Sequence, residues 1–240
     1  MIYEIAGLRV LLKNKYEYTN RLCRDYISAD QSSPVDITVS ASEEDIKEEQ
    51  AFSPNNSIGY IENVCLYRNL CREMPLFNRF LLHSSIIEYK GNGYAFLGRS
   101  GTGKSTHTKL WCRFVDGVKI INGDKPIIQI LDGKVIAHGT PWMGKEGYGN
   151  KESAPLKGLC FLQQAPNNEI APLSVKEAVR FVFPQILNPL KEISAEKTLE
   201  LIDVLVRQTP SFLLKCTISQ EAVACSYEAL TGEKYTVKEV

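Results

Sequence analysis

The stretch Gly98–Trp111, GRSGTGKSTHTKLW, decides the fold that this sequence predicts. It fits the pattern G-x-x-x-x-G-K-[S/T], with the motif residues at Gly98, Gly103, Lys104 and Ser105. The apolar run YAFL at 94–97 reads as a strand before the motif, and STHTKLWCRF at 105–114 reads as a helix after it. Glycines let successive backbone N–H groups turn inward around an anion, and the helix that follows adds its positive end. The sequence therefore predicts a phosphate-binding loop between a strand and a helix.

Each residue of this loop has an expected role. Lys104 is expected to reach the β- and γ-phosphates of ATP, and the Ser105 hydroxyl to ligate Mg²⁺. His107 and Thr108 are expected to be first-turn helix residues without chemistry. We expect the nucleotide to contact the consecutive residues Gly98, Arg99, Ser100, Gly101, Thr102, Gly103, Lys104, Ser105 and Thr106.

A nucleotide site of this kind also needs a carboxylate at the end of a neighbouring strand. Asp124 is the first acid after the apolar strand predicted at 118–121. It is a candidate to hold Mg²⁺ with Ser105, or to accept a proton from the acceptor hydroxyl. The alternative is an aspartate in a turn before Pro126, a common structural use of this residue. Asp116, in a V-D-G-V turn, is expected to be structural.

Two further candidates lie outside the motif. His83 stands at the start of the strand predicted before the motif's own strand, where a lone histidine is either structural or part of the site. The segment 139–150 is too rich in glycine for regular structure and carries Lys145 and Glu146. Such a loop can fold over a γ-phosphate and supply a second cation, Lys145, or it can be a solvated surface loop.

The bulk composition limits the classes of partner. The 240 residues hold 28 Lys+Arg and 28 Asp+Glu, so no net basic charge argues for nucleic acid. No apolar run approaches the length of a membrane span, and the N-terminus is not typical of a secretory signal. The seven cysteines are scattered without a framework, which favours reduced thiols and a cytoplasmic location.

The pattern of elements divides the chain into two expected regions. Residues 1–75 read as a small α+β region, with strands at 3–13 and 35–40 and a helix opened by Ser42. Residues 76–240 read as the nucleotide-binding domain with a mixed sheet, flanking helices and a helical C-terminal tail. Its further expected elements are strands at 81–90 and 156–163, a hairpin turning at Asp132-Gly133, and helices at 174–183, 195–207 and 219–230.

Four segments together resemble a known family. LLHSSII (81–87), GYAFLGRSGTGKSTHTKLW (93–111), IINGDKPIIQI (120–130) and HGTPWMGKEG (138–147) resemble the kinase domain of HPr kinase/phosphorylase. The resemblance is greater to its shorter relatives of unassigned substrate, which share a fold with ATP-dependent phosphoenolpyruvate carboxykinase. It implies an α/β fold of that type and Mg·ATP as phosphate donor. HPr kinase relatives assemble into hexamers, so a homo-oligomer is one option, and the oligomeric state of this chain stays open.

The resemblance also implies residue roles. Asp124 falls on the second of two adjacent family aspartates, His83 on a histidine near the phosphoacceptor site, and Lys145 near cations around the transferred phosphate. Gly123 replaces the first aspartate, the family's proposed general base. No segment matches the one that holds HPr, so HPr itself is disfavoured and the expected acceptor is a small-molecule, peptide or protein hydroxyl.

Two functions stay open at this point. One is an ATP-dependent kinase acting on a serine or another hydroxyl, with Asp124, Lys104, His83 and Lys145 as its catalytic residues. The other is a nucleotide-binding regulatory or accessory protein without transferase activity, which the glycine at 123 favours. Phosphoenolpyruvate carboxykinase itself is disfavoured because the chain is far shorter than those enzymes.

Overall fold

The computed structural model describes residues 1–187 and 192–236, and the chain forms two compact units. The first unit contains Met1–Phe77 and the first part of helix α6 (Glu192–Gln208), up to Thr198. The second contains the chain from Asn78 to Leu187 and from Leu199 onward. The chain thus changes unit between Phe77 and Asn78, and the expected C-terminal region does not stay in one unit.

The first unit is built on a three-stranded sheet. Strand β1 (Ile2–Ile5) pairs antiparallel with β2 (Leu8–Lys13), which pairs parallel with β3 (Ile37–Ser40). The expectation of one strand over 3–13 was wrong, because Ala6 and Gly7 form a tight turn with φ of 51° and 72°. The turn lets the two halves of one apolar run pair with each other.

Helices complete this unit. They are α1 (Glu17–Leu22), the short 3₁₀ helix η1 (Arg24–Tyr26), α2 (Glu43–Phe52), α3 (Ile58–Glu73) and η2 (Met74–Phe77). The expected start at Ser42 is confirmed, since its side chain and that of Asp45 form a capping box. The Glu62 carboxylate, 2% exposed, accepts hydrogen bonds from the backbone N–H groups of Lys15 and Tyr16, which ties α3 to the chain before α1.

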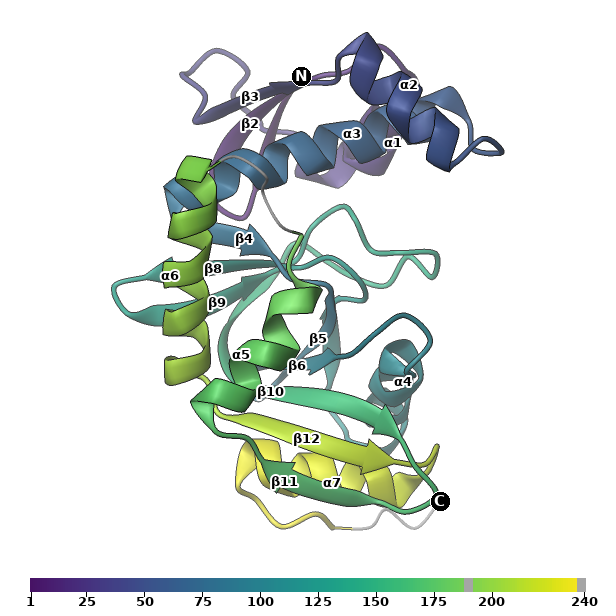
Figure 1. Ribbon diagram of the computed structural model, residues 1–240, viewed down its shortest axis with the longest axis vertical. Coiled ribbons are helices and arrows are strands. Elements are labelled where there is room, and N and C mark those ends of the chain that lie inside the picture. Colours follow the sequence, from purple (N-terminus) through teal and green to yellow (C-terminus); the bar gives the residue numbers. More distant parts are fainter. Residues whose placement is uncertain (188–191, 237–240) are drawn as a thin grey trace. The chain divides into compact units, whose positions relative to one another are not determined.

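The second unit is built on a curled mixed sheet, whose described part has nine strands (Figure 1). They are β4 (Arg79–Leu81), β5 (Ser84–Tyr89), β6 (Asn92–Leu97), β7 (Lys119–Asn122), β8 (Ile127–Leu131), β9 (Lys134–His138), β10 (Ser153–Gln164), β11 (Glu169–Pro172) and β12 (Ser211–Cys216). The main path runs β4-β8-β9-β10-β6-β5-β7, and β12 pairs with both β10 and β11.

The strand directions bring several chain segments to one edge of this sheet. Strands β10 and β12 run parallel to β6, while β5 runs antiparallel to both β6 and β7. In Figure 1 the arrows of β10 and β12 point the same way, toward the side on which α4 (Lys104–Phe114) lies. The carboxyl ends of β6, β7, β10 and β12 and the amino end of β5 therefore meet there, and open α/β sheets bind ligands at this kind of edge.

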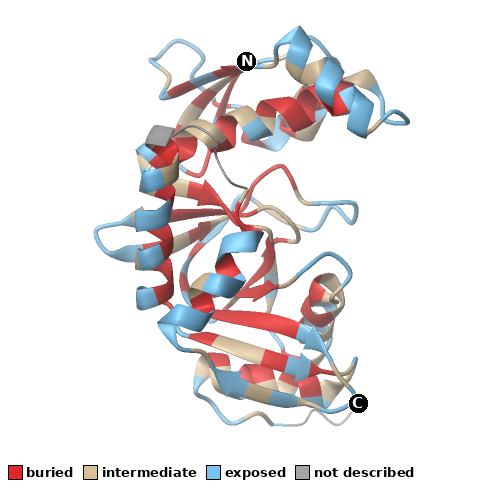
Figure 2. Cartoon of the chain, viewed as in Figure 1, coloured by how far each residue is buried: buried red, intermediate tan, exposed pale blue. Residues whose placement is uncertain are grey.

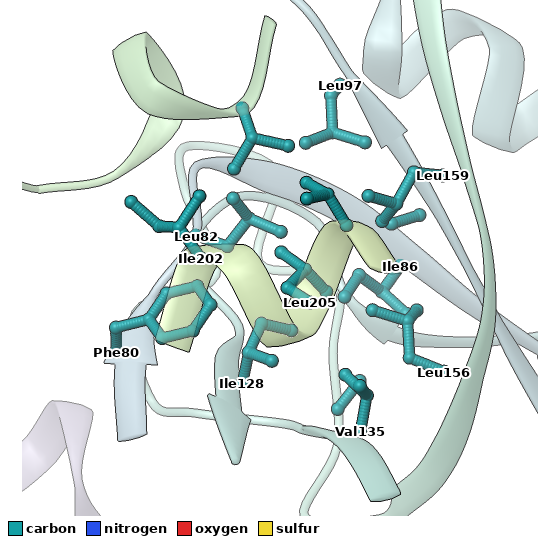
Figure 3. Packing of buried hydrophobic residues seen from close by; sticks show 14 of the residues in the cluster. Phe80, Leu82, Ile86, Leu97, Ile128, Val135, Leu156, Leu159, Ile202 and Leu205 are labelled. Carbon is teal, nitrogen blue, oxygen red and sulfur yellow. The ribbon is translucent and has the colours of Figure 1, made fainter. Parts of the chain in front are cut away.

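Alternate residues of the strands fill two cores. Ala95 and Leu97 of β6 face one cluster, with Ile202 and Leu205 of α6 packed in it, as Figure 3 shows for the labelled residues. Tyr94 and Phe96 face the other cluster, which contains Trp111 of α4 and residues of α7 (Gln220–Thr231). The period of two along β6 thus places helices on both faces of the sheet.

Four helices cover the two faces. Helix α5 (Val175–Val182), followed by the 3₁₀ helix η3 (Phe183–Gln185), contributes Ala178 and Val182 to the α6 side, and α4 and α7 cover the opposite side. Figure 2 shows the sheet strands as mostly buried between these helices. No described helix has both the length and the apolar character that crossing a bilayer requires.

Two expectations for this unit differ from the structure. The strand expected at 81–90 is present as β5 but begins later, at Ser84, because Leu82 and His83 bond to Pro126 and Gln185; Leu81 ends the separate strand β4. The tail is not wholly helical, since β12 separates α6 from α7. The hairpin at Asp132-Gly133, the capping box at Ser174 and the three helices are confirmed, with shifted ends for the helices.

Candidate functional site

The sheet edge described above carries a cavity of about 510 Å³. It lies beside the loop of residues 98–105, which joins β6 to α4. Lining residues come from the loop, from α4, from the start of β5 and the residue before it, from β7 and the turn after it, and from the segment 139–150. Nine sequence-predicted site residues line it: His83, Ser100, Gly101, Gly103, Lys104, Ser105, Thr106, Asp124 and Lys145.

The 98–105 loop contains three glycines with positive φ. Gly98, Gly101 and Gly103 have φ of 150°, 83° and 102°, and Gly103 is the N-cap of α4 in the left-handed region. Left-handed residues alternating with ordinary ones turn backbone N–H groups toward one side. A hydrogen bond within the loop stabilises its turn, since the Thr102 hydroxyl donates to the Arg99 carbonyl oxygen at 2.9 Å.

Gly98 is required by space as well as by backbone angle. A Cβ atom there would lie 2.6 Å from Thr102 Oγ1 and 3.2 Å from the Leu162 carbonyl oxygen. We expect Gly98→Ala to lower the free energy of unfolding by about 1–3 kcal/mol, measured by denaturant titration. Gly91→Ala is the matched control, with φ of 77° and nothing within 4 Å of the added Cβ. Equal losses in both variants would contradict the close approach at Gly98.

Lys104 is the first residue of α4, and its side chain contacts the loop. Its side chain is largely buried, and its Nζ donates to the carbonyl oxygens of Gly98 at 2.8 Å and Arg99 at 3.4 Å. Burial lowers the pKa of Lys104, while the charge of Asp124 raises it and that of Lys125 lowers it. The ammonium group is therefore held by two weak neutral acceptors in a site where an anion would bind it more strongly.

Asp124 follows β7 directly and lies within contact of His83. The His83 Nε2 and Asp124 Oδ1 atoms are 3.3 Å apart, and Lys125 forms an ion pair with Asp124 Oδ2. The Asn122 side chain fixes this turn by accepting hydrogen bonds from the N–H groups of Asp124 and Lys125 at 2.9 and 2.8 Å. Burial raises the pKa of Asp124, but the His83 hydrogen bond and the Lys125 charge outweigh it and lower the pKa to about 2.

The segment 139–150 is anchored on the Asn122–Lys125 turn at its start, while residues 144–148 are exposed. Asn122 donates to the carbonyl and hydroxyl oxygens of Thr140, and the Thr140 hydroxyl donates to the Lys125 carbonyl at 2.7 Å. A Cβ at Gly144 would lie 2.9 Å from the Asp124 Cβ, so the loop passes directly over this carboxylate. Lys145 lies next to this contact and lines the cavity.

Lys109 of α4 also contacts the 139–150 segment. Its Nζ lies 2.6 Å from the Glu146 carboxylate and 5.3 Å from the centre of the Tyr148 ring. Glu146 and Tyr148 both line the cavity. One wall of the cavity is therefore attached to α4 by an exposed ion pair, an attachment that a ligand could open at small cost.

Gly123 lies where the family resemblance placed an aspartate. A Cβ there would be 3.2 Å from the Tyr148 carbonyl oxygen and 3.4 Å from that of Met143. The Gly123 N–H donates to the same Tyr148 oxygen at 2.9 Å. The 139–150 segment therefore packs against Gly123, the position of the first of the two acids in the resemblance, which leaves Asp124 as the carboxylate of this turn.

His107 and Thr108 have structural contacts. Thr108 Oγ1 donates to Ser85 Oγ at 2.8 Å, which joins α4 to β5, and His107 Nε2 lies 2.9 Å from Ser226 Oγ of α7. Trp111 Nε1 donates to the same Ser226 hydroxyl at 2.9 Å. Burial lowers the pKa of His107 to about 4, so the ring is neutral near pH 7.

This neutral histidine gives the fold a pH dependence. Because the folded pKa lies below the ordinary value of 6.5, the unfolded chain binds the proton more strongly between pH 6.5 and pH 4. We expect the free energy of unfolding to decrease as the pH falls through this window. His107 should account for at most about 3 kcal/mol of that decrease. His107→Gln should have a shallower slope in denaturant titrations between pH 7 and pH 4. Identical slopes for the two proteins would contradict the buried neutral ring.

Three predicted loop residues lie outside the cavity lining. Gly98 shapes the loop, the Arg99 carbonyl accepts from Lys104 and Thr102, and Thr102 lines a second cavity on the other flank. Sequence reasoning missed Lys125, Ser85 and Gly144. Lys125 adjoins Asp124 in the sequence and could have been noticed, whereas the other two depend on pairing between distant segments.

Comparisons with known proteins add a distant likeness. No family model matches the chain. No curated protein matches it either. Among solved structures, the chain is similar to the Hpr(Ser) kinase/phosphatase from Coxiella burnetii, with 14% sequence identity and a TM-score of 0.27 over 53% of this chain and 88% of that chain. A likeness of this size carries no inference about activity, so we infer function from the residues of the cavity.

Proposed function

We propose that this chain is an ATP-dependent phosphotransferase that passes the γ-phosphoryl group to the hydroxyl of a serine or a similar acceptor. The observation that carries the proposal is one cavity lined by the 98–105 loop, Lys104, Ser105, Asp124 and His83. Phosphoryl transfer needs little covalent help from a protein and depends on positioning and charge stabilisation. In this proposal the 98–105 loop positions the phosphates, and Lys104 and Asp124 supply the charges.

The loop and Lys104 would hold the triphosphate. Backbone N–H groups at the start of α4 and the positive end of that helix favour an anion. In the structure Lys104 Nζ contacts the Gly98 and Arg99 carbonyl oxygens on the loop itself. We infer that the ammonium leaves these neutral acceptors for the β- and γ-phosphate oxygens, with Lys145 as a second cation beside the transferred group.

The residues present fit a magnesium ion bound together with the nucleotide. Mg²⁺ in phosphate sites takes one or two carboxylates, substrate oxygens and water rather than a dedicated protein cage. Ser105 and Asp124 line the same cavity, and the described residues contain no group of three His, Cys, Asp or Glu side chains suited to a metal. When bound, Mg²⁺ would neutralise charge on the β- and γ-phosphates.

The acceptor would enter beside His83 and Asp124. Its hydroxyl oxygen forms a bond to the γ-phosphorus as the bond from that phosphorus to the β,γ-bridging oxygen breaks, and ADP leaves. The acceptor proton passes to the His83–Asp124 pair, whose Nε2 and Oδ1 atoms lie 3.3 Å apart. Asp124, with its pKa of about 2, is ionised at neutral pH and can hold the imidazole as it takes up a proton.

The proposal is tested by following both products. Purified protein, Mg·ATP and either free L-serine or a serine-containing peptide should give ADP and phosphorylated acceptor in equal amounts, measured by coupled assay and mass spectrometry. Threonine in place of serine checks the acceptor class. ATP binding without phosphorylated product from any hydroxyl acceptor would contradict phosphotransfer.

One observation favours a second candidate, a nucleotide-binding regulatory or accessory protein. Gly123 and the packed 139–150 segment leave the turn with a single carboxylate, which is already paired with His83 and Lys125. A rise in melting temperature with Mg·ATP, together with no acceptor turnover, would support this candidate.

A further inference from the structure

A second cavity, of about 380 Å³, lies on the other flank of the 98–105 loop. Gly101, Gly103 and Thr106 line both cavities, so the two spaces meet across the loop. The walls of the second cavity come from the loop, from α4 and from the carboxyl ends of β10 and β12; β10 pairs with β6, and β12 pairs with the other edge of β10. A ligand held on the loop can therefore extend into either space.

The two cavities differ in charge. The first is lined by Lys104, Lys145, Asp124 and Glu146. Among the described residues, no Asp, Glu, Lys or Arg lines the second. Its one titratable ring, His107, is neutral near pH 7 because burial lowers its pKa to about 4. A ligand that spans the loop would thus have a charged end and an uncharged end.

The walls of the second cavity are mainly apolar, with a few polar groups. Leu110 of α4, Leu162 of β10 and Ile218 after β12 provide aliphatic surface, and Ile218 is 78% exposed. Gln164 Nε2 donates to the Gly101 carbonyl oxygen at 3.0 Å, so this side chain joins the cavity wall to the loop. Apolar walls with a few placed polar groups are typical of sites for flat heteroaromatic ligands.

From this arrangement we propose that the second cavity binds the adenine base of the nucleotide whose phosphates occupy the first. The proposal rests on the proposed function, because it places the base of the same ATP. Adenine offers an amino donor beside a ring-nitrogen acceptor, the pair that a Gln amide can meet with its own oxygen and nitrogen. In the DNA major groove guanine is most often read by Arg or Lys, and neither lines this cavity.

Exposed Ile218 has a specific role under this proposal. An aliphatic side chain of this size left in solvent buries apolar area when a base lies against it. Ala165 lies at the same wall, and its N–H donates to the Cys216 carbonyl at 3.1 Å, so a larger side chain there would fill the cavity without removing a hydrogen bond. Ile218→Ser and Ala165→Leu are therefore two independent ways to weaken binding of the base.

The experiment compares Mg·ATP, Mg·GTP and magnesium tripolyphosphate by titration calorimetry. We expect the intact protein to bind ATP at least about tenfold more tightly than tripolyphosphate and more tightly than GTP. Ile218→Ser and Ala165→Leu should each bring ATP affinity down toward that of tripolyphosphate, whose own affinity stays unchanged. Leu131→Ser, at an exposed leucine on the β8–β9 hairpin, is the matched control and should behave as the intact protein does.

The outcomes separate this inference from the proposed function. Binding of tripolyphosphate that equals binding of ATP, with no effect of the two cavity variants, would overturn the adenine site and leave the phosphate site standing. Stronger binding of GTP than of ATP would also overturn it. Failure of all three ligands to bind would contradict the proposed function itself.

Discussion

Replacing Lys104 with alanine should lower kcat/KM for phosphotransfer at least about a hundredfold and weaken Mg·ATP binding measurably. The ammonium group is the buried cation of the 98–105 loop, and it donates hydrogen bonds to two carbonyl oxygens of that loop. Its loss removes charge neutralisation from the γ-phosphate as charge spreads in the transition state. Steady-state kinetics and titration calorimetry measure the two effects.

Folding and charge need separate controls in this experiment. Lys134→Ala removes an exposed lysine on the β9 strand and should leave ATP affinity unchanged. Circular dichroism should show that Lys104→Ala keeps the native helix and strand content, because the lysine ammonium donates its hydrogen bonds to two carbonyls of its own loop. Unchanged turnover in a folded Lys104→Ala protein would rule out the phosphate role of this residue.

Asp124→Asn should reduce kcat by about a hundredfold to a thousandfold, with a smaller effect on ATP affinity. The amide keeps an oxygen that can face His83 but carries no charge to hold Mg²⁺ or to stabilise a protonated imidazole. Rates should be measured over a range of Mg²⁺ concentrations, since the variant is expected to need more metal. Asp116→Asn, at an exposed turn before β7, is the control and should retain full activity.

The same substitution gives a stability signature that is independent of activity. The folded pKa of Asp124, about 2, lies below its ordinary value near 4, so its charge contributes stability above about pH 4 that is lost as the pH falls toward 2. That contribution is about 2 kcal/mol. The stability difference between the intact protein and Asp124→Asn should therefore shrink between pH 5 and pH 2. A difference that stays constant with pH would contradict the ion pairs with His83 and Lys125.

The position of the 98–105 loop could be predicted from sequence because its pattern lies within a short run of consecutive residues. Glycine spacing, an apolar run before Gly98 and a helical pattern after it locate the loop between β6 and α4. The position of Asp124 followed from counting strands, and the sheet directions place it at the same edge as His83. Phosphate, ATP and Mg²⁺ binding at these residues stay predictions that the experiments above test.

Other features depend on pairing that the sequence does not show. The break between β4 and β5 arises because Leu82 and His83 bond to Pro126 and Gln185, residues far along the chain. The anchored 139–150 segment depends on Asn122, whose side chain reads as an ordinary turn residue. The second cavity needs β12 beside β10, a parallel pairing across about fifty residues that no local pattern indicates.

A crystal structure with Mg²⁺ and a non-hydrolysable ATP analogue tests the central claim most directly. We expect the β- and γ-phosphates on the N–H groups of the 98–105 loop, Lys104 Nζ turned from the Gly98 and Arg99 carbonyls to phosphate oxygens, and Mg²⁺ between the phosphates, Ser105 and Asp124. An analogue bound elsewhere, or a loop in which Lys104 keeps its contacts with those carbonyls while the nucleotide is present, would contradict the claim.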